Sequence, residues 1–501
     1  MHSLNQKNVL VLGLGASGLA LARWCVRYGA QVTVADTRPS PPQLVALEAH
    51  VPAALFVHAE MSESLLAATS FDMVFKSPGL SPAGVAGVVD AAQAQGIVCG
   101  NELSLFAQAL ADLKHDRAYA PQVIGITGTN GKTTVTSLTA QLAQRAGKSV
   151  AVAGNIGPTL LDTLAQRLDE TSSGQALPEV WVLELSSFQL DGINNFQPTV
   201  ATVLNVSQDH LDWHETLSAY AAAKAHVYGS NGLMLLNRND PLVMAALPPL
   251  VKGKQLRNYV TFGHDEPKRP GDYGIETVNG MAWLVRAAVA DETIKRRKDD
   301  EVILYIQRMM PIDALRIHGR HNATNALAAL GLAVATGCNL APMLHGLREY
   351  RGEPHRMASV AVINDVEYFD DSKGTNVGAT VAALTGLGVE RKLVVILGGE
   401  GKGQDFSPLA EPVSRYARAV VLIGRDSPLI RSALQGTDVQ LLDAASMQEA
   451  VAGAALLAHT GDAVLLSPAC ASFDMFDSYE HRARVFCEAI QALALEEGIV
   501  L

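Results

Sequence analysis

A short loop in the first third of the chain has the residue types needed to bind phosphate. Residues 127–134 read Thr-Gly-Thr-Asn-Gly-Lys-Thr-Thr. The glycines leave backbone N–H groups accessible, Lys132 supplies a positive charge, and Thr133 offers a hydroxyl to Mg²⁺ at a helix N-terminus. The spacing misses the common G-x-x-x-x-G-K-[ST] pattern, because Ile126 stands where the first glycine belongs. The sequence therefore predicts a mononucleotide site with an unusual loop.

A second glycine-rich turn lies near the N-terminus. The apolar run from Val9 to Leu12 precedes Gly13-Leu-Gly15-Ala-Ser-Gly18, a helical pattern follows, and a second strand ends at Asp36. A glycine turn before a helix can hold a nucleotide phosphate, and an acidic residue about 20 positions on can bind a ribose. Taken alone, the pattern fits a nicotinamide or flavin cofactor, another nucleotide, or a purely structural turn.

Polar residues also follow other predicted strands, at the edge where open α/β sheets bind ligands. Glu184 ends a strand in residues 181–190, and His210 follows one in residues 198–212. Both could ligate or orient Mg²⁺, but Glu184 could equally cap a turn and His210 could be a hydrogen-bonded core residue. His210 and His214 have the spacing of a zinc pair, yet the Glu of a metalloprotease is missing between them, which argues against zinc.

The last third of the chain carries three more polar loops at strand ends. They contain Asp371, Lys373 and Thr375 in DDSKGTN, Lys402 in GGEGKGQDF, and Ser472 in SPACASFDMF. Two cationic loops beside an ATP loop suit a reaction in which phosphoryl or acyl-phosphate charge accumulates. They suit a merely regulatory nucleotide poorly.

Alternating strands and helices must position these loops, so we predict an α/β protein. At 501 residues the chain is too long for one ordinary core. We predict a Rossmann-like domain in residues 1–116, a central P-loop-type ATP-binding α/β domain in 117–352, and a doubly wound α/β domain in 353–501. Residues 114–121, KHDRAYAP, are predicted as a polar linker, and residues 250–315 as short β-structure and loops.

Composition excludes several other classes of protein. A formal charge of −11 argues against nucleic acid as a partner. The sequence contains no run of 18 apolar residues, so no membrane span is expected. The five scattered cysteines and the lack of signal-peptide features predict a cytoplasmic protein without disulfides or zinc. The basic run Lys295–Lys298 is followed by acidic residues and is predicted to be a solvated loop.

Together, these motifs resemble the Mur ligases of peptidoglycan synthesis. Ten motifs occur in the family's order over nearly the whole chain: TGTNGKTT, GNIG, ELSSFQL, QDHLD, the lysine of YAAAKAHVY, HNATN, PHR, DDSKGTN, GGEGK and SPACASFDMF. Each is weak alone, and the set is highly specific. The resemblance is strongest to the branch that adds D-glutamate to UDP-N-acetylmuramoyl-L-alanine. The unusual loop is then the family's own ATP loop.

The resemblance implies a role for each matching residue. The N-terminal turn would bind a uridine nucleotide and not a dinucleotide, so the UDP-substrate would contact Gly15, Ala16, Ser17, Thr37, Arg38 and Asn155. ATP would contact Gly128, Thr129, Asn130, Gly131, Lys132, Thr133, Thr134, Asn322, Asn325, Arg356 and Asp371. D-Glutamate would contact Lys373, Thr375, Lys402, Ser472 and Phe473.

The resemblance also implies the cofactors and the reaction. Two Mg²⁺ ions are expected, with ligands among Thr133, Glu184, His210 and Lys224, the last as a carbamate formed with CO₂. Lys132, Lys224, His210 and Lys402 are the expected catalytic residues. The substrate carboxylate would attack ATP to give an acyl phosphate, which the amine of D-glutamate then attacks. Closure of the third domain would exclude water. A monomer without nucleic-acid partners is expected.

Departures and rival interpretations remain open at this point. Gly374 stands where the family usually has Ala, Arg482 is followed by Ala483 where Gly is frequent, and residues 268–310 look longer than a minimal member needs. Rivals within the class are the ligases that add L-alanine, a diamino acid or a dipeptide, and folylpolyglutamate synthetase. From other classes, a dehydrogenase would leave the ATP loop unused, and a non-catalytic nucleotide-binding regulator would leave Lys224, Lys373 and Lys402 unexplained.

Overall fold

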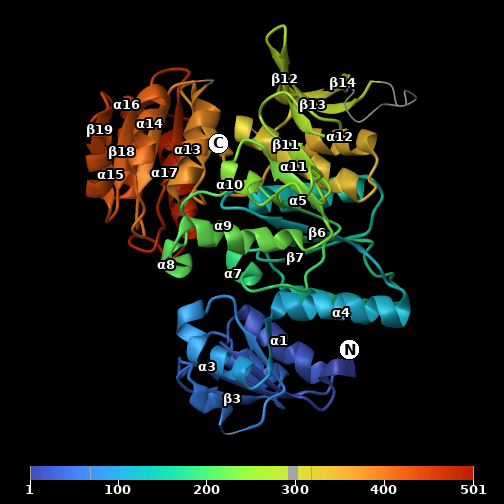
Figure 1. The fold of residues 1–501 in the computed structure, drawn as a ribbon. Helices are drawn as coiled ribbons and strands as arrows, with labels where there is room; N and C mark the ends of the chain where they lie inside the picture. Colours follow the sequence, from blue (N-terminus) through green and yellow to red (C-terminus); the bar gives the residue numbers. More distant parts are fainter. Residues whose placement is uncertain (1, 68, 291–302, 318, 390, 500–501) are drawn as a thin grey trace. The chain divides into compact units, whose positions relative to one another are not determined.

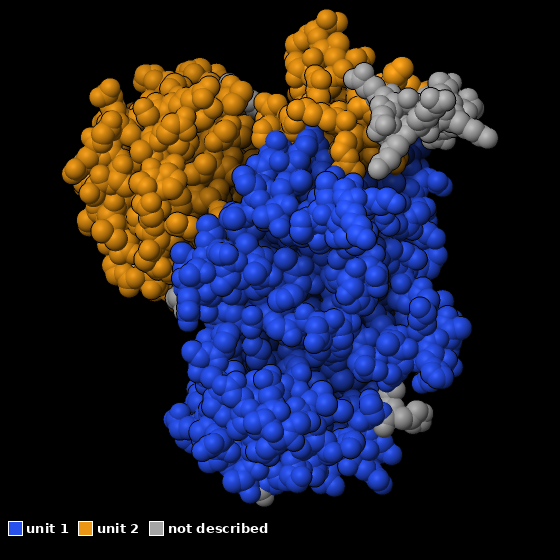
Figure 2. Space-filling model, in the orientation of Figure 1, with its two compact units in different colours: residues 1–206, 210–262, 328–343 blue, residues 207–209, 263–327, 344–501 orange. Residues whose placement is uncertain are grey.

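The computed structural model describes residues 2–67, 69–290, 303–317, 319–389 and 391–499, which contain four β-sheets. Contacts divide the chain into two compact units (Figure 2). Unit 1 holds residues 1–206, 210–262 and 328–343, and unit 2 holds residues 207–209, 263–327 and 344–501.

The first sheet of unit 1 is fully parallel, as the Rossmann-like prediction requires. Its order is β3-β2-β1-β4-β5, with β1 (Asn8–Leu12), β2 (Gln31–Asp36), β3 (Leu55–His58), β4 (Met73–Lys76) and β5 (Val98–Asn101). Successive strand residues point to opposite faces. Val9 and Val11 therefore pack with α1 (Ala16–Arg27) and α4 (Glu102–Arg117), whereas Leu10 and Leu12 pack with α3 (Pro82–Ala94) (Figure 1). The remaining helix of this part is α2 (Leu44–His50).

The second sheet of unit 1 is also parallel and carries the predicted ATP loop. Its order is β11-β10-β9-β6-β8-β7, with β6 (Gln122–Thr127), β7 (Val150–Gly154), β8 (Val180–Glu184), β9 (Val200–Val203), β10 (Leu233–Asn237) and β11 (Tyr259–Phe262). The helices along this part of the chain are α5 (Lys132–Arg145), α6 (Leu160–Glu170), α7 (Ser187–Leu190), α8 (Leu211–His214), α9 (Leu217–Ala225) and α10 (Pro241–Met244). All five residues of β8, which lies between β6 and β7, are buried, which explains why this strand is apolar up to its last residue, Glu184.

Unit 2 contains a small antiparallel sheet and a large C-terminal sheet. The small one joins β12 (Tyr273–Val278), β13 (Met281–Val289) and β14 (Leu304–Pro311). The large one has the order β15-β16-β20-β17-β18-β19, with β15 (Ala358–Ile363), β16 (Val366–Asp370), β17 (Leu393–Gly398), β18 (Ala417–Ile423), β19 (Gln440–Asp443) and β20 (Ala463–Leu466). Only the edge strand β15 runs antiparallel to its neighbour among these strands of the described chain.

Helices cover both faces of the large sheet, so the C-terminal part is doubly wound (Figure 1). One face packs against α13 (Val377–Gly388), α14 (Ala410–Tyr416) and α15 (Ser427–Leu434), and the other against α16 (Met447–Leu457) and α17 (Tyr479–Glu496). Alternation along β17 explains the division: Val395 points to the first face and Val394 and Ile396 to the second. Two further helices are α11 (Arg320–Ala335) and α12 (Leu340–Glu349).

Two details of the sequence prediction need correction or fall outside the structure. Residues 114–117, predicted as linker, form the last turn of α4, because the apolar spacing of that helix continues to Leu113 and basic residues suit a helix C-terminus. The run Lys295–Lys298 lies outside the described residues. Within the part of the chain that the structure describes, no helix is long and apolar enough to cross a membrane.

Candidate active site

The predicted ATP loop connects β6 to α5. Gly131 precedes α5 with a φ of 81°, and Gly128 has a φ of 155°, backbone conformations that residues with a Cβ rarely adopt. Lys132 is the first residue of α5, and its Nζ donates hydrogen bonds to the carbonyl oxygens of Gly128 (2.9 Å) and Thr129 (2.8 Å). The lysine therefore folds over the same loop whose N–H groups are expected to bind phosphate.

Asn205, which sequence reasoning did not single out, holds this loop in place. It follows β9, accepts from the backbone N–H of Thr129 through its carbonyl oxygen, and accepts from the N–H of Asn130 through Oδ1, both at 2.9 Å. Its Nδ2 donates back to the Asn130 carbonyl at 3.1 Å. The signal was available, since Asn205 follows a predicted strand at the ligand-binding edge, but its partner could not be read from the sequence.

Lys224 meets the ATP loop from α9. Its side chain is 1% exposed, and its Nζ donates to the Gly128 carbonyl at 2.9 Å and lies 4.3 Å from the ring centroid of Tyr220. A lysine on a predicted helix is by default solvated, and this one is buried. Lys132 and Lys224 thus share Gly128 O as an acceptor, which brings two predicted catalytic lysines to one atom of the loop.

Glu184, the last residue of β8, is a buried carboxylate with one oxygen open. The side chain is 2% exposed, and Oε1 accepts from Asn155 Nδ2 at 2.7 Å. Oε2 has no hydrogen-bond partner among the residues that the structure describes. A buried carboxylate oxygen without a partner is costly unless a cation or donor reaches it, so the residue fits a metal ligand.

The two histidines of the predicted site have different surroundings. His210 stands just before α8 with a positive φ of 54°, and its ring lies 4.8 Å from that of Phe188. His214 is buried and its Nε2 is 2.9 Å from Ser187 Oγ. The described part of the chain contains no group of three or more His, Cys, Asp or Glu side chains arranged to hold a metal. A metal site here would therefore need the Thr133 hydroxyl or a modified Lys224.

The N-terminal turn is held by Asp36. The Asp36 carboxylate accepts from Leu14 N at 2.7 Å, and from the backbone N–H, Nε and Nη2 of Arg38 at 2.9, 2.8 and 2.7 Å. Burial raises the pKa of Asp36, but these hydrogen bonds lower it by more, to about 2. Asp36 thus fixes the turn that carries Gly15, Ala16 and Ser17 and is not open to a ribose, while Thr37 is exposed beside it.

In unit 2, Asp371 follows β16 and is buried with a raised pKa. Ser467 Oγ donates to its Oδ2 at 2.7 Å. Burial raises the pKa of Asp371 to about 7, although the hydrogen bond from Ser467 and the nearby Arg356 guanidinium lower it. The structure therefore brings Arg356 and Asp371 together. It also pairs Asn325 Nδ2 with Asn322 Oδ1 at 3.1 Å, on the first turns of α11.

Gln404 connects the three loops that carry the predicted D-glutamate residues. Its Oε1 accepts from Val377 N at 2.9 Å, just after the loop of Lys373 and Thr375. Its Nε2 lies 3.0 Å from Gly401 O, in the loop of Lys402, and 3.5 Å from Ala469 O, in the loop that leads to Ser472. Sequence analysis missed Gln404, because nothing in GGEGKGQDF shows that its amide reaches two other loops.

Arg482 of α17 connects two of these loops through hydrogen bonds from its guanidinium group. The guanidinium is fully buried and donates to Ser372 Oγ (3.0 Å), Ser372 O (2.7 Å) and Cys470 O (3.1 Å). Burial lowers its pKa to about 10, so it stays charged at neutral pH. Gly374 is tightly enclosed in the same region, since a Cβ there would lie 2.8 Å from Asp371 Oδ2.

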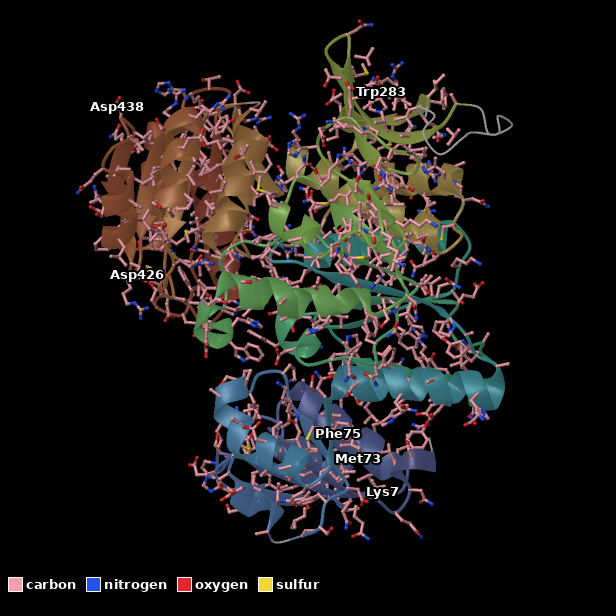
Figure 3. The ribbon with its side chains drawn as sticks, viewed as in Figure 1. Lys7, Met73, Phe75, Trp283, Asp426 and Asp438 are labelled. Atoms are coloured by element: carbon pink, nitrogen blue, oxygen red, sulfur yellow. The ribbon has the colours of Figure 1, made fainter. Side chains whose placement is uncertain are left out.

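The side chains expected to meet D-glutamate are less uniformly placed than the loops. Lys402 is exposed with a positive φ of 52°, Phe473 is 68% exposed, and Ser472 is 2% exposed. Lys373 Nζ lies 5.0 Å from the ring centroid of Tyr479. Asp426 (Figure 3) accepts from Gly401 N at 2.6 Å and so fixes the base of the Lys402 loop.

Comparisons with known proteins match the whole length of the chain. Three family descriptions match: "Mur ligase MurD-like, N-terminal domain" (residues 7–100), "Mur ligase middle domain" (126–333) and "Mur ligase, glutamate ligase domain" (355–470). A protein of Albidiferax ferrireducens named UDP-N-acetylmuramoylalanine–D-glutamate ligase is 65% identical over 99% of this chain and 98% of its own. Proteins with the same name from Polaromonas sp. and Ralstonia nicotianae are 60% and 54% identical, over 100% and 98% of each chain. The chain belongs to the Mur ligase family.

Solved structures support the three-domain fold of this Mur ligase. The MurF ligase of Thermotoga maritima with ADP is 16% identical, with a TM-score of 0.57 over 98% of this chain and 96% of its own. The UDP-N-acetylmuramate-alanine ligase of the same organism is 19% identical, with a TM-score of 0.52 over 97% and 100%. At such identities the likeness concerns the fold alone.

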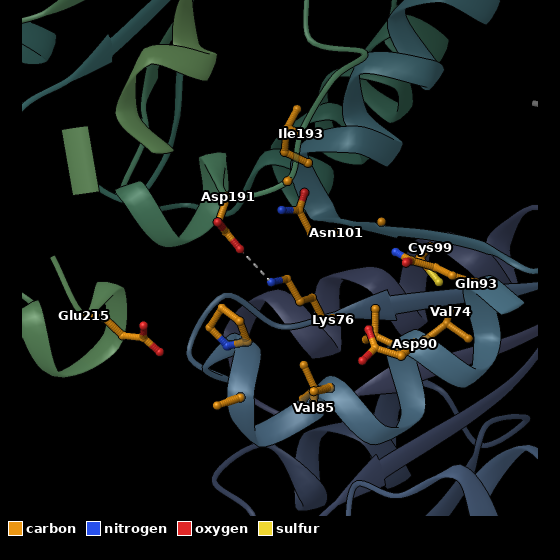
Figure 4. Close-up of a pocket in the computed structure, with 16 residues that line it drawn as sticks. Val74, Lys76, Val85, Asp90, Gln93, Cys99, Asn101, Asp191, Ile193 and Glu215 are labelled. Carbon is orange, nitrogen blue, oxygen red and sulfur yellow. Dashed lines mark hydrogen bonds and ion pairs between the residues drawn. The ribbon is translucent and has the colours of Figure 1, made fainter. Parts of the chain in front are cut away.

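A separate pocket of about 450 Å³ in unit 1 of this Mur ligase lies apart from the predicted site residues (Figure 4). Its sixteen lining residues come from β4, α3, β5, the segment after α7 and Glu215, just after α8, and none of them is a predicted site residue. The Lys76–Asp191 ion pair (3.2 Å) crosses it. The predicted site is therefore defined by loops at strand ends and not by this cavity.

Proposed function

We propose that this chain is the ATP-dependent ligase that joins D-glutamate to UDP-N-acetylmuramoyl-L-alanine, forming ADP and phosphate. One observation carries the proposal: relatives bearing the name of this ligase are 54–65% identical over nearly the whole chain. The geometry of unit 1 supports it, since two lysines, a buried glutamate and a glycine loop gather where ATP chemistry would need them.

The first step would activate a carboxylate. An oxygen of the L-alanyl carboxylate attacks the γ-phosphorus of ATP, the bond to the β-phosphate oxygen breaks, and ADP leaves an acyl phosphate. When ATP binds, the Lys132 ammonium group would give up its hydrogen bonds to Gly128 O and Thr129 O and donate to phosphate oxygens instead. It would keep these contacts while the phosphoryl group is transferred. The loop N–H groups, fixed by Asn205, would bind the same oxygens without reorganisation.

ATP and Mg²⁺ are the cofactors of the family, and the residues here fit the metal. The open Oε2 of Glu184 is the observation in favour, and Thr133, His210 and a carbamate on Lys224 would complete the ligand set. Bound Mg²⁺ would neutralise charge on the phosphoryl oxygens. The carbamate would form when the neutral amine of Lys224 attacks CO₂ and loses a proton, which replaces a cation by an anion at the loop.

The second step would join the amino acid. The D-glutamate amine attacks the acyl carbon, phosphate leaves with the C–O electron pair, and the amine loses a proton. D-Glutamate carries two carboxylates, which need cationic or hydroxyl partners in a desolvated site. Lys373, Thr375, Lys402 and Ser472, on loops that Gln404 connects, are the proposed partners. Arg356, Asp371, Asn322 and Asn325 are proposed to contact the nucleotide.

An amino-acid panel tests the proposal directly. The full chain is incubated with ATP, Mg²⁺ and UDP-N-acetylmuramoyl-L-alanine, and ADP release is measured with each amino acid. D-Glutamate should support release, whereas D-alanine and L-lysine should not, because the site's polar groups would be left unpaired. Efficient ligation of L-alanine, L-lysine or diaminopimelate would overturn the substrate assignment and leave the ligase class standing.

A further inference from the structure

Glu102, the first residue of α4, is a buried carboxyl group that the proposed mechanism does not use. Its side chain is 1% exposed. It lies where three helices of unit 1 pack together: α1, α4 and α6. Two of them lead from predicted substrate segments, since α1 begins at the glycine turn of Ala16 and Ser17, and α6 follows the loop of Asn155.

One oxygen of Glu102 caps α6 from a distant part of the chain. Oε1 accepts from the backbone N–H of Leu161 at 3.0 Å. The residue before the helix, Thr159, makes no side-chain cap, because its hydroxyl donates to Asp162 Oδ2 at 2.9 Å instead. Glu102 therefore satisfies an N–H at the start of α6 that would otherwise lack a partner inside the protein.

The other oxygen of Glu102 is buried without a hydrogen bond, and the carboxyl group lies close to Ser17 of the N-terminal turn. Oε2 has no hydrogen-bond partner of ordinary geometry in the described part of the chain, although the Ser17 hydroxyl lies near enough to lower the pKa of the carboxyl group as a hydrogen-bond donor. A buried carboxylate with an unsatisfied oxygen is unfavourable, and protonation relieves part of this cost. The positive ends of α1 and α6 offset some of the remaining charge.

We propose that Glu102 is a positioning residue for the nucleotide end of the substrate: it joins the diphosphate-binding turn to α6 and takes up a proton when the diphosphate binds. The inference rests on the proposed function and on the expectation, drawn from the family resemblance, that the UDP-substrate meets Ala16 and Ser17 through its diphosphate. A diphosphate at this turn and an ionised Glu102 would both be stabilised by the partial positive charge at the N-terminus of α1, and the two negative groups would repel each other. A protonated Glu102 removes that repulsion and can donate a hydrogen bond to Ser17.

The charges around Glu102 agree with this linkage. Burial raises the pKa of Glu102 to about 7, Ser17 and the Leu161 N–H lower it, and the charge of Asp162 on α6 raises it. From α1, Arg23 faces the same region and pairs with Asp162 at 3.4 Å, while His50 of α2 lies 2.8 Å from Arg23. Two added negative charges on a diphosphate would raise the pKa further, so protons are bound together with substrate near neutral pH.

Calorimetric titration of the full chain with UDP-N-acetylmuramoyl-L-alanine tests the proposal. Titrations between pH 6 and 8.5, in buffers of different ionisation enthalpy, count the protons taken up. The wild type should take up as much as one proton above pH 7, and its affinity should fall with rising pH, by about tenfold for each pKa unit that the diphosphate adds. Glu102→Gln, which keeps an acceptor for Leu161 N, should take up none and bind with nearly constant affinity.

Glu179→Gln is the matched control, since this exposed carboxylate of unit 1 bonds Lys148 and Ser149 and should leave proton uptake unchanged. In steady-state assays, Glu102→Gln should change KM for the UDP-substrate and leave KM for D-glutamate as it was. If Glu102→Gln does not fold, an infrared difference spectrum of the wild type should still show a carboxyl group becoming protonated on binding.

Binding without proton uptake, or full uptake by Glu102→Gln, would overturn the role of Glu102 and leave the proposed function intact. A wild type that binds no UDP-substrate at any pH would instead refute the proposed function.

Discussion

The predicted ATP-binding residues of unit 1 and the predicted amino-acid-binding residues of unit 2 hold their charges differently. In unit 1, Lys132 and Lys224 turn back onto the carbonyl oxygen of Gly128, and Lys224 is almost completely buried. In unit 2, Lys402 and Phe473 are exposed, whereas Gln404, Arg482 and Asp426 fix the loops beneath them. In the ATP loop, both the backbone and the charged side chains are thus held in place before any ligand binds. In the amino-acid loops, only the backbone is held in place.

This difference predicts that substitutions in the two sets of residues affect different kinetic constants. A group that is held in place before binding spends little free energy on ordering, so its removal mainly affects the chemical step. An exposed side chain must be ordered by its ligand, so its removal mainly affects affinity. Variants in unit 1 should therefore lower kcat, and variants of the exposed residues in unit 2 should raise KM.

Lys132→Ala should have the largest effect. We expect ADP formation to fall by at least about 10³-fold at saturating substrates, because a charge on the transferring phosphoryl group is lost. The melting temperature should change little, since no core packing is removed. Lys148→Ala, which removes a lysine paired with Glu179 on the surface of unit 1, serves as the control. Near-normal turnover by Lys132→Ala would show that this loop is not the catalytic ATP site.

Lys224→Ala should come next, with a loss of roughly 10²-fold or more in kcat, and formate or acetate should restore part of the activity by supplying an anion. Lys224→Arg should be inactive with or without these anions, because a guanidinium does not form a carbamate. Full activity of Lys224→Arg would exclude the carbamate, and ADP release with each variant is the measurement.

Lys402→Ala should raise KM for D-glutamate by about 10-fold to 100-fold, the range for one charge-assisted hydrogen bond, and lower turnover less. KM for ATP should not move. Arg415→Ala is a suitable control, since Arg415 stands on α14 of the same unit, outside the predicted site. If Lys402→Ala changed KM for ATP and not KM for D-glutamate, the comparison between the two sets of residues would be reversed.

The smallest effect concerns stability and pH. The pKa of Asp371 is raised to about 7 from 3.8 in the fold, so the folded state binds more protons than the unfolded state between these values. Stability should therefore fall as pH rises from about 4 to 7, and Asp371→Asn should lose this contribution. The difference in unfolding free energy between the two proteins is the measurement.

Asp438→Asn, at an exposed site of unit 2 (Figure 3), should follow the wild type at every pH. Parallel curves for wild type and Asp371→Asn would show that Asp371 has an ordinary pKa in the fold.

The sequence was sufficient where local chemistry decides structure. The alternation of apolar strands with helices predicted the α/β domains, and glycine, lysine and serine residues marked the loops at the strand ends. The family resemblance predicted the fold class, which the matched domains confirm. The antiparallel edge strand β15 was not foreseen, because strand direction depends on pairing between distant segments and not on periodicity.

The residues that connect the loops could not be predicted. Asn205, Gln404 and Glu102 look like ordinary polar residues in sequence, and their roles follow from partners that are 75, 27 and 59 positions away. The burial of Arg482 was equally invisible, since a lone arginine on a helix is usually solvated. The roles assigned to individual site residues stay predictions.

The proposed carbamate on Lys224, formed with CO₂, would require that the ammonium group first release a proton and leave the carbonyl oxygen of Gly128. With 1% of the side chain exposed, both the proton and the gas must pass between packed neighbours. Carbamate formation would therefore be slow beside turnover. A sample kept in degassed buffer would start slowly and accelerate after bicarbonate is added, so that its measured rate would depend on its history.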